Sequence, residues 1–298
     1  MQTVKKTQNI LITGASGLLG NWLVTLTEDS FQVTPTDVVA SAQPNAINAD
    51  ITDAENVRHL FQNAKPELVI HTASETNVDR CEIERERAWK INVLGTRNIA
   101  DACVEKGAKL VYVSTDYVFD GEKSLYNEDN APNPIDFYGL TKLEGERQAL
   151  RRCRNLAILR TSVLYGRHPT KQDFATWVIG KLRQRQDIAV VDDHFNTPTL
   201  AENLAKMALE VGVNDLQGLF HASGCERINR YDFARKIANA FGLDSTLIKP
   251  TKMMELKAWI AKRPKDSSLN TEKVQRELKT KPLSINEGLR KLKEELKA

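Results

Sequence analysis

The chain has 298 residues, with 42 Lys and Arg against 39 Asp and Glu, so its formal net charge is +3. Hydrophobic residues make up 41% and charged residues 27%, which excludes a disordered, collagen-like or disulfide-scaffold chain. Acidic and basic residues are interleaved, so we expect no nucleic-acid partner. The apolar stretch at residues 10–19 is too short and interrupted to cross a bilayer, and no secretory signal precedes it. We therefore expect no membrane association and a cytoplasmic location.

The cysteines give no sign of a metal or redox site. Cys81, Cys103, Cys153 and Cys225 lie far apart with no CxxC pair, which favours isolated reduced thiols. The histidines show no metal-ligand spacing, so we expect no metal. The run at residues 82–87 alternates in charge and is typical of a solvated helix face.

The first two-thirds of the chain alternates strand-length apolar runs with helical patterns. It predicts strands over residues 9–13, 31–36, 67–71, 109–114 and 156–160, and helices over 18–26, 54–64, 82–105 and 139–151. Such alternation is typical of an α/β protein with a Rossmann-type, doubly wound parallel sheet.

The alternation weakens after about residue 165. We expect helices over 174–185, 200–211 and 231–241, one strand over 218–222, and charged helices over 271–278 and 286–296. This predicts a dinucleotide-binding Rossmann domain at residues 1–165. Residues 166–298 then form mainly a smaller α/β substrate lobe, with part of 190–222 returning to the sheet domain.

A glycine-rich segment follows the first predicted strand and opens the first helix. Glycines permit a sharp turn and the close approach of a pyrophosphate, and the helix start offers free N–H groups. A tight turn without a ligand is the alternative, but the strand before it and the helix after it favour dinucleotide binding. The residues predicted to bind the cofactor here are Gly14, Ser16, Gly17, Leu18, Leu19 and Gly20.

Asp37 lies at the end of the second predicted strand, 17 residues after Gly20. This is near the offset of a carboxylate that binds the adenosine ribose hydroxyls. A carboxylate repels a 2′-phosphate, and no Arg or Lys lies between Asp37 and Asp53 to accept one. NAD(H) is therefore favoured and NADP(H) remains open; a solvated turn aspartate is the alternative reading.

Tyr138 and Lys142 place a phenol and an ammonium four residues apart in a predicted helix. Both would face the same way, about 6 Å apart along the axis. A carbonyl that receives hydride needs a proton on its oxygen, which Tyr138 can supply while Lys142 holds the nicotinamide ribose. Thr115, at a strand end, can hydrogen-bond the same carbonyl. The alternatives are a solvated helix face and a hydroxyl that caps the backbone.

These motifs together resemble the extended short-chain dehydrogenase/reductase family. The spacing GxxGxxG and the Tyr138–Lys142 pair carry the resemblance to the family as a whole. The run Ser114–Gly121 (STDYVFDG) is similar to the dTDP-4-dehydrorhamnose reductase branch, as are 71–74, 91–93, 160–162, 197–199 and 263–264. The resemblance covers nearly the whole chain.

The resemblance implies reduction of a 4-keto-6-deoxy nucleotide sugar by NAD(P)H. It makes Thr115, Tyr138 and Lys142 the catalytic residues. It adds Asp50, Ile51, Thr72, Ala73, Ser74 and Asn92 to the cofactor site. Around the substrate it implies Thr76, Asp116, Tyr117, Val118, Val163 and Arg263, where Arg263 either holds a diphosphate or forms a structural ion pair. A homodimer is compatible with it.

Two departures leave the reaction open. Val163 replaces the tryptophan usual in this branch near the sugar, and Glu75 interrupts a stretch that is usually alanine-rich. An epimerase or dehydratase on the same scaffold is one alternative, although Tyr117 stands where a dehydratase would carry glutamate. A non-catalytic, dinucleotide-binding regulatory subunit, like that of methionine adenosyltransferase, is the other.

Overall fold

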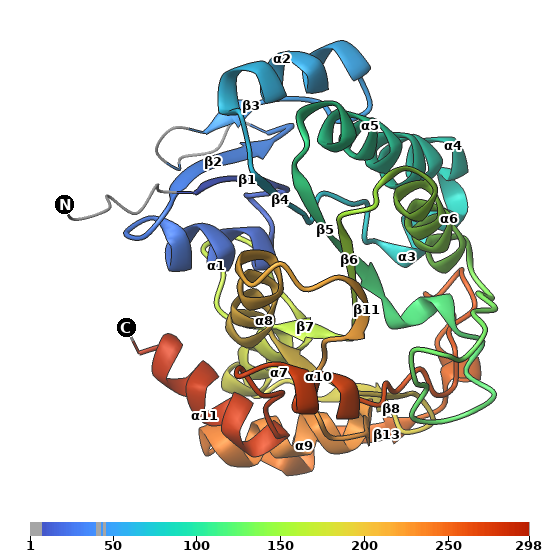
Figure 1. Cartoon of the computed structure of the whole chain (residues 1–298). Coiled ribbons are helices and arrows are strands. Elements are labelled where there is room, and N and C mark those ends of the chain that lie inside the picture. Colours follow the sequence, from blue (N-terminus) through green and yellow to red (C-terminus); the bar gives the residue numbers. More distant parts are fainter. Residues whose placement is uncertain (1–7, 40–42, 44–45, 298) are drawn as a thin grey trace.

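The structure, a computed structural model, describes residues 8–39, 43 and 46–297. Its centre is a seven-stranded parallel sheet in the order β11-β6-β5-β4-β1-β2-β3 (Figure 1). The strands are β1 (Asn9–Thr13), β2 (Gln32–Asp37), β3 (Ile47–Asn48), β4 (Leu68–His71), β5 (Lys109–Thr115), β6 (Leu156–Thr161) and β11 (Gly218–His221). The chain runs outward from β1 in both directions, so the strand order reverses between β1 and β4. The predicted α/β class is confirmed.

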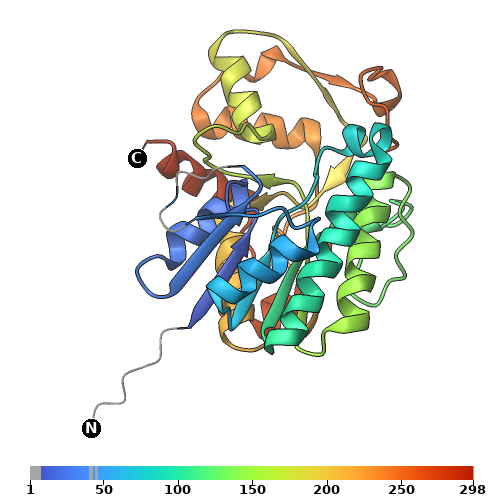
Figure 2. The same ribbon diagram turned by 90° about the horizontal axis from the view of Figure 1, so that it is seen from above.

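Helices cover both faces of the sheet because its strands alternate their apolar side chains between two cores. Ile10 and Ile12 of β1 pack in one core with α1 (Leu18–Thr27) and α8 (Ala201–Val213). Leu11, between them, packs in the other core with α2 (Ala54–Ala64) and α5 (Thr96–Lys106). Figure 2 shows α5 beside α6 (Phe137–Arg152), the helix predicted to carry the Tyr/Lys pair.

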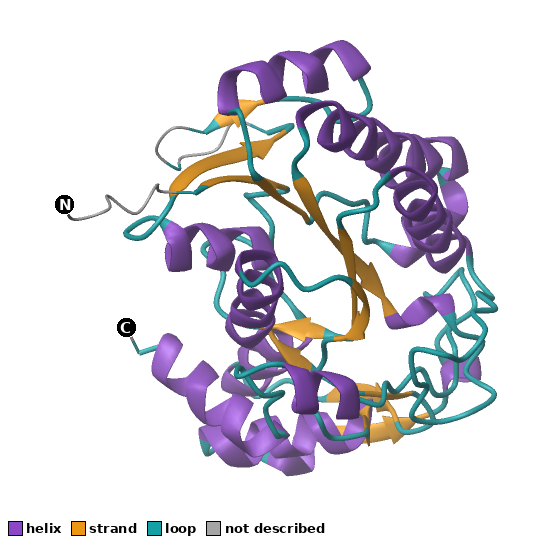
Figure 3. Cartoon of the chain, in the orientation of Figure 1, coloured by secondary structure: helices purple, strands orange, loops and turns teal. Residues whose placement is uncertain are grey.

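The rest of the chain adds a smaller lobe with its own core. Its helices are α7 (Phe174–Arg183), α9 (Arg230–Phe241) and α11 (Ile285–Glu295), with short 3-10 turns at Ser245–Leu247 and Met253–Glu255. The short helix α10 (Glu272–Glu277) packs instead against β11 of the large sheet. Three two-stranded pairs join the helices of the lobe: β7 (Leu164–Tyr165) with β10 (Thr199–Leu200), β8 (Ile188–Val191) with β13 (Ile248–Thr251), and β9 (Phe195–Asn196) with β12 (Ile228–Asn229). Figure 3 shows β8 beside β13 as orange arrows. Strand β11 is part of the large sheet, and helix α8 packs on it. The domain boundary at residue 165 stays a prediction.

The single helix predicted over residues 82–105 is wrong. The chain instead forms α3 (Val78–Ile83), α4 (Arg85–Trp89), a π-helical stretch η1 (Lys90–Gly95) and then α5. Glu84 leaves the helical conformation, with φ −103° and ψ 57°. The wider π turn carries Asn92, whose buried amide bonds to the loop after β4, so tertiary contacts override local helix propensity here.

Across the described ranges, no helix is long and apolar enough to cross a membrane.

Candidate functional site

One cavity of about 1360 Å³ opens at the carboxyl ends of the parallel strands. Gly14 follows β1, Asp37 ends β2, Thr72 follows β4 and Thr115 ends β5, so the sheet brings four distant segments to one edge. Most of the predicted site residues line this cavity: Gly14, Gly17, Leu18, Leu19, Gly20, Asp37, Asp50, Ile51, Thr72, Ala73, Ser74, Thr76, Thr115, Asp116, Tyr117, Tyr138, Lys142 and Val163.

Val118 and Arg263 do not line the cavity. Val118 is fully buried in a separate apolar cluster beneath the Tyr/Lys helix, because the short 3-10 turn η2 (Asp116–Val118) points it away from the cavity. Arg263 donates to Asp79 over 2.8 Å and lies 5.0 Å from the ring centre of Trp259. This ion pair is one of the two roles predicted for Arg263; the other, holding a diphosphate, stays a prediction.

The glycine loop has no room for side chains. A Cβ on Gly14, whose φ is +70°, would lie 2.7 Å from the backbone nitrogen of Ala73, and a Cβ on Gly20 would lie 2.2 Å from the carbonyl oxygen of Gly14. Gly17 is the N-cap of α1 and supplies no capping side chain, so among the described residues no side chain bonds to the N–H groups of that helix start. The Ser16 hydroxyl lies outside the cavity lining, buried and without a partner in the described chain.

Asp37 ties this loop to the end of β2. Its Oδ2 accepts the N–H of Ser16 at 3.0 Å, and its Oδ1 accepts the N–H of Val38 at 2.8 Å. The carboxylate is therefore held in one orientation at the cavity wall, rather than solvated in a turn. Such a fixed carboxylate can accept ribose hydroxyls.

Tyr138 and Lys142 lie one turn apart in α6, and both side chains line the cavity. The Lys142 Nζ donates to the carbonyl oxygen of Val113 at 2.8 Å and lies 4.3 Å from the ring centre of Tyr112. Burial lowers the pKa of Lys142 to about 7. Burial also raises the pKa of Tyr138 above its ordinary value, against a smaller opposite effect of its hydrogen bond with Thr115. Tyr138 is therefore protonated at neutral pH, as a proton donor must be.

Thr115 lies between Tyr138 and a buried carboxyl group. Its hydroxyl donates to Asp116 Oδ1 at 3.0 Å and accepts the N–H of Tyr117 at 3.2 Å. Asp116 Oδ2 accepts the hydroxyls of Ser162 at 2.8 Å and Ser267 at 2.5 Å, while burial raises the pKa of Asp116. Asp116 thus links β5, β6 and the C-terminal lobe. We did not predict the two serines, because no local pattern marks partners that lie 46 and 151 residues away.

Asn92 supports the site from behind, without lining the cavity. Its Oδ1 accepts the Ser74 hydroxyl at 2.9 Å and the Glu75 N–H at 2.8 Å. Its Nδ2 donates to the Glu75 carbonyl at 3.1 Å and to the Thr141 hydroxyl at 2.9 Å. One buried amide therefore fastens the loop after β4 to the helix that carries Tyr138 and Lys142.

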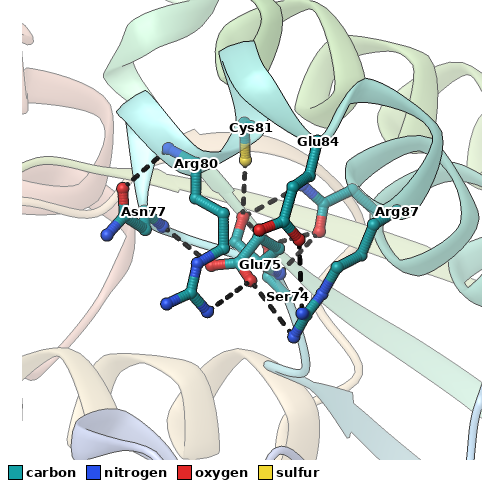
Figure 4. A network of polar contacts seen from close by, with 8 residues as sticks. Ser74, Glu75, Asn77, Arg80, Cys81, Glu84 and Arg87 are labelled. Carbon is teal, nitrogen blue, oxygen red and sulfur yellow. Dashed lines mark hydrogen bonds and ion pairs between the residues drawn. The ribbon is translucent and has the colours of Figure 1, made fainter. Parts of the chain in front are cut away.

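Glu75 carries its carboxylate to the cavity wall. Its Oε2 lies 3.5 Å from Arg80 and 3.7 Å from Arg87, and Figure 4 shows both guanidinium groups directed toward it. Arg87 also pairs with Glu84, so the rim of the cavity is a small network of alternating charges. The alternating charges at residues 82–87 predicted a solvated helix face. These residues are largely exposed, but several of them also border the cavity.

Further residues from the C-terminal half complete the lining: Thr161, Leu164, Lys171, Gln172, Asp173 and Arg230. We did not predict any of them. They belong to β6, β7, the segment before α7 and the start of α9, and only the folded lobe brings them to the glycine loop.

The doubly wound sheet and the glycine loop define a Rossmann-type scaffold of the dehydrogenase/reductase class. Within that class, residues 8–298 match the family described as RmlD substrate binding domain, and the chain belongs to this family.

The similar proteins include reductases and a subunit of methionine adenosyltransferase. The crystal structure of dTDP-4-dehydrorhamnose reductase from Bacillus anthracis in complex with NADP matches with a TM-score of 0.90 and 33% identity, covering 97% of this chain and 99% of that one. Methionine adenosyltransferase 2 subunit beta of Xenopus tropicalis is 36% identical over 248 residues, which are 80% of this chain and 74% of that protein. The probable low-salt glycan biosynthesis reductase Agl14 of Haloferax volcanii is 35% identical over 276 residues, 90% of this chain and 91% of that protein.

Proposed function

We propose that the protein is an NAD(P)H-dependent reductase of a 4-keto-6-deoxy nucleotide sugar. The observation that carries the proposal is that Thr115, Tyr138 and Lys142 line the same cavity as the glycine loop. The 33% identity to a dTDP-4-dehydrorhamnose reductase supports the substrate class. A location in the cytoplasm and a homodimer stay predictions.

The residues of the loop fit a dinucleotide. Gly14 and Gly20 leave the backbone free for a pyrophosphate, and the start of α1 offers N–H donors to its oxygens. Asp37 suits the hydroxyls of the adenosine ribose, so we propose NAD(H) as the favoured cofactor, with NADP(H) as the alternative. When bound, the reduced nicotinamide supplies hydride.

In this reaction Tyr138 donates its phenolic proton to the carbonyl oxygen of the substrate. Thr115 rotates its hydroxyl proton from Asp116 toward the same oxygen and polarises it, while its Oγ1 still accepts the N–H of Tyr117, which keeps the side chain in place. Lys142 holds the hydroxyls of the nicotinamide ribose and stabilises the phenolate that remains on Tyr138.

Replacing the tyrosine tests the proposal. We expect Tyr138→Phe to lower turnover of an enzymatically generated dTDP-4-keto-6-deoxy sugar by about 10²–10⁴-fold, because the phenylalanine has no proton to donate. Turnover is followed by the loss of absorbance of NADH, or separately of NADPH, and the dissociation constant of the cofactor should be unchanged. Tyr231→Phe, in the core of the C-terminal lobe, is the matched control. Turnover of Tyr138→Phe near that of the wild type would contradict the assignment.

A second candidate function is that of a dinucleotide-binding subunit of another enzyme. The 36% identity to methionine adenosyltransferase 2 subunit beta favours it. Co-expression with a methionine adenosyltransferase catalytic chain, followed by light scattering, separates the two proposals. A stoichiometric complex together with no oxidation of NADH or NADPH supports the subunit, whereas substrate-dependent oxidation by the isolated chain supports the reductase.

A further inference from the structure

Arg230 carries an unpaired positive charge at the cavity wall. It is the first residue of α9 and lines the cavity from the side of the C-terminal lobe. Its guanidinium lies 4.9 Å from the ring centre of Phe174. No hydrogen bond or ion pair joins this guanidinium to another residue in the part of the chain that the structure describes.

The other arginines near the site have carboxylate partners. Arg160 pairs with Glu146 at 2.7 Å, and Arg263 pairs with Asp79 at 2.8 Å. Asp116 attracts Arg230 electrostatically, but no contact joins the two, and three hydroxyl groups already occupy its oxygens. Arg230 therefore stands out as a cation to which the described residues supply no partner.

The position of Arg230 is unfavourable for stability. Burial lowers the pKa of Arg230, and the like charge of Arg263 acts in the same direction. The first turn of a helix carries a partial positive charge, which a cation opposes. A desolvated charge without a partner costs free energy, so an arginine kept at such a place favours a ligand that supplies the missing anion.

We propose that Arg230 is an oxyanion subsite for the substrate, taking two oxygens of a phosphoryl or carboxylate group. The planar guanidinium fork matches such a pair of oxygens. Arg230 lines the same cavity as Tyr117 and Tyr138, so an anion at Arg230 and the proposed proton donor share one cavity. The inference rests on the proposed function in naming the ligand as substrate. The anion is then either the diphosphate of the nucleotide or an acid group on the sugar.

Calorimetric titration of the protein saturated with NADH tests the subsite. The probes are inorganic pyrophosphate, D-glucuronate and, as the neutral counterpart, D-glucose. We expect Arg230→Gln to weaken binding of one anion at least tenfold, Arg230→Lys to weaken it less, and the exposed Arg235→Gln in the same helix to leave it unchanged. Loss confined to pyrophosphate identifies the diphosphate as the group bound, and loss confined to glucuronate identifies a sugar acid.

Three results would overturn the inference: neither anion binds the wild type, Arg230→Gln binds both as the wild type does, or Arg230→Gln is less stable to urea than the wild type without ligand. The last outcome would show that contacts within the fold, such as that with the Phe174 ring, stabilise the guanidinium, which would then have a structural role. The two proposals fail separately. Arg230-dependent anion binding with no oxidation of NADH or NADPH would contradict only the reductase.

Discussion

Lys142 reaches the cavity from an almost wholly buried position, with its ammonium between a carbonyl oxygen and an aromatic ring. The pKa of about 7 means that the group is charged at pH 6 and largely neutral at pH 8 in the protein without ligand. A dinucleotide pyrophosphate favours the charged form, so binding above pH 7 must be accompanied by uptake of a proton.

We therefore expect the dissociation constant of NADH to rise by up to about tenfold per pH unit above pH 7. Fluorescence titration between pH 6 and 8.5 measures it, and calorimetry in buffers of different ionisation enthalpy counts the proton. Lys142→Met should bind more weakly and lose this pH dependence. An identical pH dependence in the variant would assign the proton to another group.

The carboxylate of Asp37 has two separable effects, one on the loop and one on cofactor choice. Asp37→Asn keeps an oxygen that accepts the Ser16 N–H and removes the charge. We expect the ratio of NADPH to NADH affinity to rise roughly tenfold, because repulsion of a 2′-phosphate is lost. Parallel titrations with both cofactors measure the ratio, with the exposed Asp29→Asn as control. An unchanged ratio would show that Asp37 does not face the ribose.

At the scale of elements, helix α6 begins at an unusual cap. Asp136 Oδ1 accepts the N–H of Gly139 at 2.8 Å, but its Oδ2 is buried and has no partner among the described residues. Burial raises the pKa of Asp136 to about 7. This pKa lies above the value of the unfolded chain. The free energy of unfolding therefore rises as the pH falls below 7, whereas above pH 7 the buried negative charge lowers it.

Asp136→Asn should therefore raise the free energy of unfolding at pH 8 by roughly 2–4 kcal/mol, since the amide keeps a cap and removes the charge. The gain should fall below about 1 kcal/mol near pH 4, where the wild-type carboxyl is protonated in the native state. Urea unfolding at the two pH values measures it. The exposed cap Asp53→Asn of α2 should show no such difference. Equal effects at both pH values would contradict the buried-charge explanation.

The local elements were predictable to different extents, for physical reasons. The long strands and helices around the glycine loop follow from periodic apolar patterns, and β1, α1, β5 and α6 lie where these patterns predict them. The two-residue strands β7, β9, β10 and β12 are too short to carry a period. The π-helical stretch inside the helix predicted over 82–105 carries the buried amide of Asn92, whose partners include Thr141, 49 residues further along the chain.

At the scale of the whole molecule, the cavity also combines residues that the sequence could place and residues that it could not. The residues after β1, β2, β4 and β5 could be placed at one edge, because parallel strands end together. Arg230 and Ser267 could not, because their approach depends on how the C-terminal lobe packs on the sheet. Val118, predicted near the substrate, lies outside the cavity lining for a related reason: a three-residue 3-10 turn decides which neighbour of Tyr117 faces the cavity.

Buried neutral histidines tie distant parts of the molecule together. His71 joins β1 to α5 through hydroxyls of Thr13 and Thr96 at 2.6 and 3.1 Å, and His221 bonds the Tyr126 carbonyl at 2.9 Å. Burial lowers the pKa of both imidazoles to about 3 and also lowers that of His194. These folded-state values lie below the ordinary value, so the stability they contribute is lost as the pH falls from 6.5 toward 3.

The variant His221→Gln tests the contribution of one of these histidines to the pH dependence of stability. Between pH 7.5 and 5.5 the His221 imidazole of the wild type becomes protonated in the unfolded state but stays neutral in the native state. This difference lowers the free energy of unfolding by about 1.4 kcal/mol. The wild type should therefore lose about that much more unfolding free energy than the variant over this interval, whatever the variant's stability at pH 7.5. Guanidinium unfolding at both pH values measures the difference. His59→Gln, at a side chain that is 65% exposed, should lose as much as the wild type. If His221→Gln also lost as much as the wild type, then His221 would be protonated in the native state, and the acid sensitivity would have to arise elsewhere in the fold.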